Sequence, residues 1–214
     1  MVRYADTYLE LRGNPNHLLG YGLSRRTKQT IRLCRPYVEA HPGTLTIVDL
    51  GCADGFMLSQ LAAAFPDRQF SLMGFDRFPK GMPAPSTGPG IRYAQVDLFS
   101  NEPLPVGDGH ADIVIASAFV KHHPRTQDFL REAHRMLRVG GILVMLDPRP
   151  WVVHVGRLLS YFSREFTPSI WSERTIRKIL KEQMQGSFGI EKFERYWMSP
   201  RKEFYSPRIE DSAP

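Results

Sequence analysis

Residues 45–55 read LTIVDLGCADG, and they are the most informative segment of the chain for predicting its fold. Its first six residues are almost continuously apolar and β-branched, as expected of a strand that is buried on both faces. Gly51 and Gly55 then permit a sharp turn, because glycine tolerates backbone conformations that other residues avoid. Residues 56–65 are predicted to form a helix, which Pro66 ends. The stretch therefore predicts a strand, a turn and a helix, the unit from which parallel α/β sheets are built.

The alternation of strands and helices continues along the chain. The predicted strands after the first are 70–76, 91–97, 111–117 and 142–146, and the other predicted helices are one that Ser24 caps and His41-Pro42-Gly43 ends, one over 126–137 that Gly140-Gly141 ends, and one over 172–183. Such alternation over about a hundred residues indicates an α/β fold with a parallel, doubly wound sheet and helices on both faces. Right-handed crossovers place the ligand crevice of such a sheet at the carboxyl ends of its strands.

Three aspartates end three successive predicted strands: Asp49, Asp76 and Asp97. A single carboxylate at a strand end is commonly solvated or structural. Three in succession beside a glycine turn are harder to explain in that way, because the strand ends border one crevice. Together they indicate a ligand rich in hydrogen-bond donors, such as hydroxyls, amines or a cation.

The charge around the glycine turn separates two classes of nucleotide ligand. A nicotinamide or flavin dinucleotide carries a pyrophosphate, which prefers a helix N-terminus free of carboxylates. Asp49 and Asp54 put two negative charges around this turn, and Gly51-x-Ala53-x-Gly55 departs from the spacing G-x-G-x-x-G. The same charges would attract a ligand that carries an ammonium and a sulfonium group. The sequence therefore disfavours a dinucleotide.

The turn and four later motifs resemble those of the class I S-adenosylmethionine-dependent methyltransferases, in particular the small enzymes of quinone, lipid and secondary-metabolite biosynthesis. The turn resembles the family motif D-x-G-x-G-x-G, with Ala53 in place of the middle glycine. The other matching segments, in the family's order over roughly residues 40–150, are GFD at 74–76, VDL at 96–98, ADIV at 111–114 and LREAHRMLRVGG at 130–141. The resemblance implies in-line transfer of a methyl group from S-adenosylmethionine to a small or lipid-like acceptor.

The resemblance also implies an architecture. The family's sheet is seven-stranded and mostly parallel, and a C-terminal antiparallel hairpin closes it; residues 188–198 and 203–209 are the segments expected to form that hairpin. The expected organisation is an N-terminal helical cap at 1–40, a Rossmann-like methyltransferase domain at 41–208 and a tail at 209–214. Residues 148–171 carry an apolar stripe at helical spacing, which is either a helix packed on the core or a lid over the acceptor pocket.

The resemblance assigns the cofactor site residue by residue. It orients Asp49 toward the methionine ammonium, gives Asp76 both ribose hydroxyls, and gives Asp97 the adenine amino group. It places Leu98 with its N–H facing a ring nitrogen, and Ser117 near the ammonium and the sulfonium. The full set of implied cofactor-binding residues is Asp49, Gly51, Cys52, Ala53, Gly55, Asp76, Arg77, Asp97, Leu98 and Ser117.

The segment Lys121-His122-His123-Pro124 follows the fourth strand and is expected to lie beside the transferred methyl group. Positioning supplies much of the rate of an in-line displacement, and a general base is needed only if the acceptor must lose a proton. His122 or His123 is the candidate catalytic base; alternatively, both pack against or cap the following helix. No Asn/Asp-Pro-Pro-Tyr/Phe element follows this strand, which argues against methylation of amino groups on DNA bases or glutamine side chains.

The composition limits the remaining alternatives. The chain has 214 residues, a formal net charge of +6 and two cysteines, Cys34 and Cys52, without metal-ligand spacing. We expect no metal, no transmembrane segment and a cytoplasmic location, with a homodimer as one option for assembly. The positive charge makes an RNA methyltransferase the alternative function. A non-catalytic binding protein that retains the fold is a third interpretation.

Overall fold

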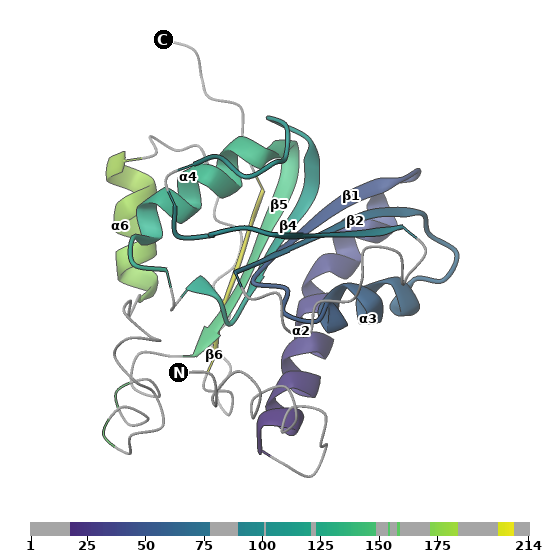
Figure 1. The fold of residues 1–214 in the computed structure, drawn as a ribbon, viewed down its shortest axis with the longest axis horizontal. Coiled ribbons are helices and arrows are strands. Elements are labelled where there is room, and N and C mark those ends of the chain that lie inside the picture. The colour runs from purple at the N-terminus through teal and green to yellow at the C-terminus, as the bar shows by residue number, and fades with distance from the viewer. Residues whose placement is uncertain are drawn as a thin grey trace.

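The computed structural model describes residues 18–77, 90–100, 102–120, 123–148, 154, 158, 172–183 and 201–207. Ten helices and strands lie within these residues (Figure 1). In chain order they are α2 (Leu18–Ala40), β1 (Leu45–Leu50), α3 (Phe56–Ala64), β2 (Phe70–Asp76), β3 (Ile91–Gln95), β4 (Ala111–Ser117), α4 (Thr126–Met136), β5 (Leu137–Pro148), α6 (Glu173–Gln183) and β6 (Arg201–Pro207).

The described strands form one sheet in the order β3-β2-β1-β4-β5-β6. Strands β1 to β5 run parallel, and β6 runs antiparallel to β5. The chain moves outward from β1 through β2 to β3 and then returns to the other side of β1 with β4. This reversal of strand order at β1 and β4 is the place where α/β sheets of this kind bind ligands. The predicted parallel, doubly wound sheet is confirmed.

The C-terminal part of the predicted sheet is only partly described. Strand β6 falls on the second segment expected to form the hairpin and has the expected antiparallel direction. The first segment of that hairpin, residues 188–198, lies outside the described residues, and so does the tail at 209–214. The described sheet therefore has six strands, and the seventh strand stays a prediction.

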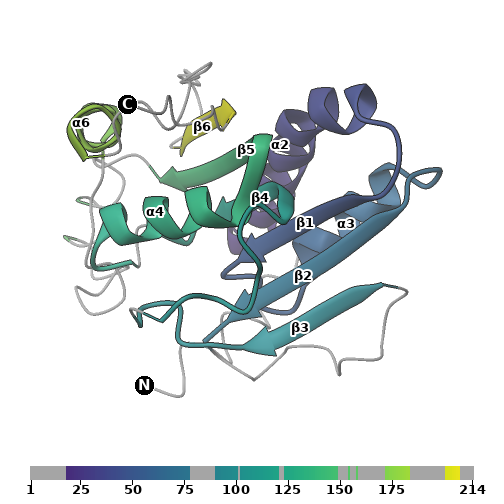
Figure 2. The same ribbon diagram turned by 90° about the horizontal axis from the view of Figure 1, so that it is seen from above.

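Helices cover both faces of the sheet, as predicted. Successive side chains of a strand point to opposite faces, and the buried residues accordingly form two clusters. One joins α2 and α3 to one face through Cys34, Val38, Leu58, Ile47 and Ile113; the other joins α4 and α6 to the opposite face through Phe129, Leu130, Ile176, Val48 and Val114. Figures 1 and 2 show these two helix pairs on the two sides of the sheet.

One predicted helix end was wrong, and another was placed one residue too far along the chain. Helix α2 begins at Leu18, so Ser24 lies inside the helix and does not cap it; a good capping residue is favoured at a helix start but does not enforce one. Helix α4 ends at Met136, four residues before the glycines expected to end it, because Leu137 is extended and pairs with Ala111 of β4.

The glycine pair after α4 has a different role from the predicted one. Gly140 has a φ of +76°, and the register between β4 and β5 shifts between Ala111 and Ile113. A Cβ atom on Gly141 would lie 3.0 Å from the carbonyl oxygens of Arg138 and Asp112. These glycines therefore allow an irregularity at the start of β5 and its close approach to β4.

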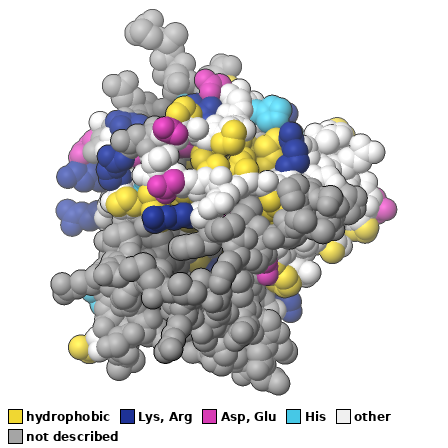
Figure 3. Space-filling model, in the orientation of Figure 1, with side chains coloured by type: hydrophobic (Ala, Val, Ile, Leu, Met, Phe, Trp, Pro, Cys, Tyr) yellow, Lys and Arg dark blue, Asp and Glu magenta, His cyan; other side chains and the backbone are white. Residues whose placement is uncertain are grey.

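The surface over α4 and α6 carries charges of both signs. Figure 3 shows Lys and Arg side chains gathered there, with Asp and Glu side chains among them. Arg125 and Arg131 both pair with Asp128, at 2.6 and 3.7 Å, and Lys178 pairs with Glu182 at 3.8 Å. In the part of the chain that the structure describes, no helix combines the length and apolar character needed to cross a bilayer.

Candidate functional site

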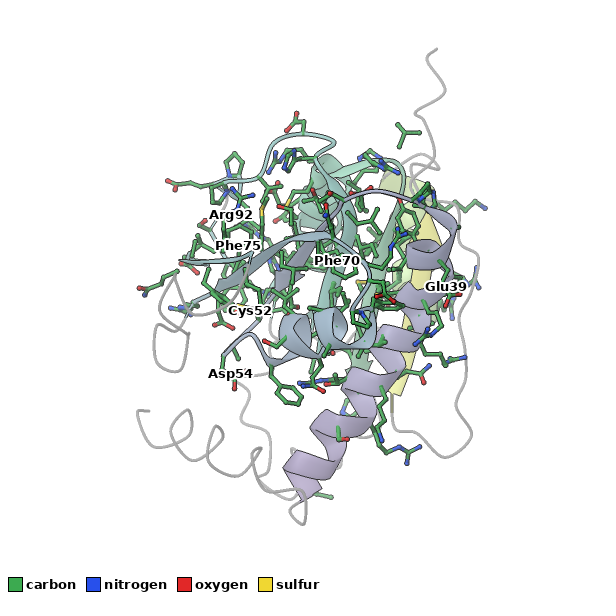
Figure 4. The ribbon with its side chains drawn as sticks, turned by 90° about the vertical axis from the view of Figure 1, so that its right-hand side faces the viewer. Glu39, Cys52, Asp54, Phe70, Phe75 and Arg92 are labelled. Atoms are coloured by element: carbon green, nitrogen blue, oxygen red, sulfur yellow. The ribbon has the colours of Figure 1, made fainter. Side chains whose placement is uncertain are left out.

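The turn between β1 and α3 is built from left-handed backbone conformations. Gly51 and Gly55 have φ values of +78° and +75°, and Ala53 has a φ of +50°. A Cβ atom on Gly51 would lie 2.7 Å from the Cδ2 atom of Phe119, so both conformation and space require glycine there. Figure 4 shows Cys52 and Asp54 in this turn, on the far side of the molecule from Glu39 near the end of α2. The turn therefore lies at the carboxyl end of β1.

The N–H groups of the turn donate hydrogen bonds within the protein. The amides of Gly51 and Cys52 donate to the Phe75 carbonyl, at 2.8 and 3.1 Å. The Gly55 amide donates to the Cys52 carbonyl at 2.9 Å, and the Ala53 amide donates to a side chain described below. A phosphate-binding turn works by offering free amides to the ligand. With these four amides engaged, the turn is unsuited to a pyrophosphate.

Asp49 is a buried carboxylate beneath the turn. Its side chain lies on the face of the sheet that α2 and α3 cover, and only 2% of the residue is exposed. Burial raises the pKa of Asp49 to about 7; the positive charge of Arg26 on α2 opposes this shift, and the negative charge of Asp76 adds to it. A cationic group bound nearby would stabilise the carboxylate that burial disfavours. The protein itself therefore supplies only part of the positive charge that would stabilise the ionised Asp49 carboxylate.

Asp76 connects the end of β2 to the turn. Its Oδ2 atom accepts the Ala53 amide at 2.8 Å, and only 9% of the residue is exposed. A carboxylate that holds one backbone amide still has lone pairs for further donors. Asp76 can therefore hold the turn and accept ligand hydroxyls at the same time.

The predicted residues after β2 and β3 lie together. The Arg77 Nε atom is 4.0 Å from the Asp97 Oδ1 atom, and both side chains are about half exposed. The same Asp97 oxygen accepts the Phe99 amide at 3.1 Å, while Leu98 is buried beside it. This cluster offers one accessible carboxylate, which can accept a hydrogen bond from the edge of a flat ring. It also offers an apolar surface, on which the face of such a ring can pack.

His123 is packed among aromatic rings. Its ring lies 5.5–6.1 Å from three phenylalanine rings, those of Phe99, Phe119 and Phe129. Its Nδ1 atom accepts the amide of Arg125, the N-cap residue of α4, at 3.2 Å. Burial lowers the pKa of His123, and a hydrogen bond with the Leu98 backbone opposes that shift. These contacts are those of a capping and packing residue. His122 lies outside the described residues.

A depression of about 600 Å³ borders the cluster of Asp97 and Leu98 on its α4 side. Its floor is apolar and includes Phe119 and Phe129, and its rim carries both acidic and basic side chains. His123 also lines this depression.

Two residues near the turn were not among the predicted site residues. Arg26 is one of several basic residues of α2, and its charge acts on Asp49. Tyr93 of β3 reaches the turn, and a Cβ atom on Gly55 would lie 2.0 Å from its hydroxyl oxygen. No local pattern singled out either residue, because each contact joins segments that are distant in sequence.

A family model for a methyltransferase domain matches residues 48–145, which include the turn, all three strand-end aspartates and α4. Residues 48–145 therefore form a methyltransferase domain of the class I S-adenosylmethionine-dependent type. The family that the sequence motifs indicated is thereby confirmed, and its cofactor is S-adenosylmethionine.

Two relatives and one solved structure illustrate the similarity of this methyltransferase. A ubiquinone/menaquinone biosynthesis C-methyltransferase of Rubrivivax gelatinosus is 30% identical over 152 residues, which are 68% of this chain and 56% of that protein. A trans-aconitate 2-methyltransferase of Azoarcus sp. is 32% identical over 60% of this chain and 47% of its own. The chain thus spans about half the length of the curated relatives it matches. An S-adenosylmethionine-dependent methyltransferase of Mesorhizobium loti shares the fold with a TM-score of 0.63 at 18% identity, over 82% of this chain and 98% of that one.

The site of this methyltransferase fits its cofactor. The Ser117 hydroxyl is buried at the end of β4 and has no hydrogen-bond partner among the described residues. Asp49 pairs in register with Ile115, so Ser117 lies on the same face of the sheet and one step nearer its carboxyl edge. A buried hydroxyl without a partner is costly, and an ammonium group bound between Ser117 and Asp49 would satisfy both.

Proposed function

We propose that this chain transfers the methyl group of S-adenosylmethionine to a small or lipid-like acceptor by in-line displacement. The observation that carries the proposal is the buried Asp49 carboxylate beneath a turn whose amides are engaged within the protein. Such a turn favours a cationic ligand over a phosphate. When bound, S-adenosylmethionine supplies an electrophilic methyl group on a sulfonium.

The described residues suggest how each part of the cofactor would be held. Asp49 and Ser117 would bind the methionine ammonium, since one is a buried carboxylate and the other a buried hydroxyl without a partner. Arg26 has a buried Nε atom without a hydrogen-bond partner among the described residues, and its positive charge suits the methionine carboxylate. Asp76 would accept the ribose hydroxyls and Asp97 the adenine amino group.

Two of the implied contacts concern backbone groups. The Leu98 amide would face a ring nitrogen of the adenine beside Asp97. Because the amides of Gly51, Cys52 and Ala53 already donate within the protein, we expect the methionine portion to meet carbonyl oxygens of the turn. Carbonyl oxygens attract the ammonium and the sulfonium, so this arrangement agrees with the charge of Asp49.

The names of the relatives support the class of acceptor. One is named as a C-methyltransferase of ubiquinone/menaquinone biosynthesis and the other as a trans-aconitate 2-methyltransferase. The decisive experiment is a methyl-transfer screen of a metabolite and quinone library, with formation of S-adenosylhomocysteine as the readout. Asp76→Ala serves as the inactive control. Tight binding of NAD with no response to S-adenosylhomocysteine would overturn the proposal, whereas cofactor binding without any turnover would support the non-catalytic interpretation.

For the two candidate bases, we propose that His123 caps and packs α4 and that His122 is the residue to test for catalysis. The burial that lowers the pKa of His123 favours its neutral form, which accepts the Arg125 amide. His123→Gln should therefore lower stability and leave the rate per folded molecule within about threefold of wild type. If His122 is a base, His122→Gln should lower turnover by about 10²–10⁴-fold with cofactor affinity unchanged. A large loss of turnover in folded His123→Gln would reverse the two assignments.

A further inference from the structure

We propose that Tyr93 is a positioning residue that holds the glycine turn in the conformation that receives the cofactor. This inference rests on the proposed placement of S-adenosylmethionine at that turn. It concerns a residue of β3, at the edge of the described sheet, that is separated from the turn by the whole width of β2.

The path of the Tyr93 side chain across the sheet is set by strand register. Tyr93 pairs with Gly74 of β2, and Gly74 pairs with Asp49 of β1, so the three residues lie in one row on one face. A Cβ atom on Gly74 would lie 2.9 Å from the Cδ1 atom of Tyr93. The tyrosine ring therefore lies over Gly74, and the absence of a side chain there lets it reach toward β1.

The hydroxyl end of Tyr93 reaches the start of α3. A Cβ atom on Gly55 would lie only 2.0 Å from this hydroxyl oxygen. The Tyr93 hydroxyl also lies near the Ser59 side chain, whose hydroxyl donates to the Gly55 carbonyl at 3.2 Å. Burial raises the pKa of Tyr93, so the hydroxyl stays protonated at neutral pH. These contacts connect β3 to the last residue of the turn and to the first turn of α3.

Gly74 accommodates a second side chain from the turn. A Cβ atom at this position would lie 2.8 Å from the Cys52 Sγ atom, and Cys52 is buried. The turn is thus packed against β2 from one side by Cys52 and covered at Gly55 by Tyr93. Since the turn contains three residues in the left-handed region, its conformation depends on such contacts. Loss of the Tyr93 side chain should let the turn leave the binding-competent conformation.

The test compares Tyr93→Leu with Phe70→Leu, a matched control. Phe70 is a half-buried aromatic residue that packs on the same hydrophobic cluster, but at the opposite end of β2 and away from the turn. We expect Tyr93→Leu to raise the Kd for S-adenosylhomocysteine about tenfold, as when the competent conformation falls to about a tenth of the population. Phe70→Leu should lower the melting temperature by about as much as Tyr93→Leu does. It should leave the Kd for S-adenosylhomocysteine within about twofold of the wild-type value.

Two milder variants keep the inference testable if Tyr93→Leu does not fold. Tyr93→Phe removes the hydroxyl, and Ser59→Ala removes the donor to the Gly55 carbonyl without touching the sheet; each should raise the Kd about threefold, as the loss of one polar contact would. Equal affinity losses in Tyr93→Leu and Phe70→Leu, or unchanged affinity in all Tyr93 and Ser59 variants, would overturn the inference. Failure of the wild-type protein to bind S-adenosylhomocysteine would instead refute the proposed function.

Discussion

Asp76 and Asp112 are buried aspartates near opposite ends of the same sheet, and each accepts a backbone amide. Asp76 accepts the Ala53 amide at 2.8 Å beside the turn, and Asp112 accepts the Thr46 amide at 2.7 Å near the start of β1. Asp112 also pairs with Arg138 at 2.8 Å. The two residues are therefore matched in burial and in local bonding but differ in their distance from the site.

This pair gives a controlled test of the cofactor site. Asp76→Ala should raise the Kd for S-adenosylhomocysteine at least about tenfold, because hydrogen bonds to a charged acceptor contribute about 1.5–3 kcal/mol each. Asp112→Ala should lower the free energy of unfolding and leave the Kd nearly unchanged. Calorimetric titration of both variants with S-adenosylhomocysteine checks the prediction. Equal weakening by the two substitutions would mean that general loosening of the sheet, and not a ribose contact, explains the loss.

Asp49 predicts a pH dependence of cofactor binding near neutrality. Burial raises the pKa of Asp49 to about 7, and a bound ammonium favours the ionised carboxylate. The affinity for S-adenosylhomocysteine should therefore rise between about pH 6 and about pH 8, with release of a proton from Asp49. Calorimetry in two buffers of different ionisation enthalpy measures that proton. Asp49→Asn should bind more weakly and lose this pH dependence; an unchanged pH dependence in the variant would assign it to another group.

The raised pKa of Asp49 also makes the stability of the ligand-free protein depend on pH, and in the opposite direction from the cofactor affinity. Its sign follows from comparing the folded value of about 7 with the value of about 3.9 for an aspartate in an unfolded chain. The folded state binds the proton more tightly, so this group's contribution to stability is fully present below about pH 3.9 and is lost as the pH rises through about 7. Stability and cofactor affinity should thus respond to Asp49 ionisation in opposite directions.

A site residue can be predicted from the sequence only if a local sequence pattern marks it. Asp49 and Asp76 lie at the carboxyl edge of the sheet, as predicted, because each comes at the end of a buried strand and parallel strands end at one edge. Arg26 could not be separated from its basic neighbours, because the rotation of α2 against the sheet decides which side chain faces Asp49. Tyr93 was missed for a similar reason, since its contact with Gly55 depends on the register of three strands.

At the scale of elements, Arg135 of α4 holds the segment before β4 onto its helix. Its guanidinium donates to the carbonyls of Val106 and Leu104, at 2.7 and 3.1 Å. It also pairs with Glu132 and Asp108, both at 2.6 Å, and Glu132 in turn accepts the Leu104 amide at 2.7 Å. One partly buried arginine thus satisfies several groups of a segment that has no regular secondary structure of its own.

Removal of this arginine should be costly, and an exposed ion pair on α6 supplies the control. Arg135→Ala removes the guanidinium that donates to the Val106 and Leu104 carbonyls and pairs with Glu132, so we expect a loss of about 2–3 kcal/mol in the free energy of unfolding. Lys178 is exposed and lies 3.8 Å from Glu182, so Lys178→Ala should cost no more than about 0.5 kcal/mol. Urea denaturation of both variants measures the difference. Similar losses in the two would show that the segment is held by other contacts.

The sequence predicted the presence of the helices and strands more reliably than it predicted where each one ends. Strands β2 and β4 have the predicted bounds because each is a short apolar run between clear breaks. The end of α4 was misplaced because the helical pattern of apolar residues continues past Met136, while Leu137 instead pairs with Ala111 across the sheet. A long-range strand contact overrode a local helical preference, and no local pattern reports such a contact.

For the whole molecule, the distribution of charge decides between a small acceptor and RNA. The formal net charge is +6, but the cations described over α4 and α6 are partly neutralised by neighbouring acids. Figure 3 shows this mixture of signs on that surface. A protein that binds a nucleic acid through its phosphates needs unpaired cations on one face, because the release of counterions drives that binding.

Binding to heparin and RNA at several salt concentrations therefore tests the alternative function. We expect weak retention on heparin and a shallow plot of log affinity for single-stranded RNA against log salt, equivalent to about two phosphate contacts or fewer; a true RNA site would give a slope of about −0.7 per contact and many contacts. The double variant Asp128→Asn/Glu182→Gln should strengthen both interactions, since it removes the acids that pair with Arg125, Arg131 and Lys178. A steep salt dependence in the wild-type protein, unchanged in the variant, would favour an RNA acceptor and direct the substrate screen to structured RNAs.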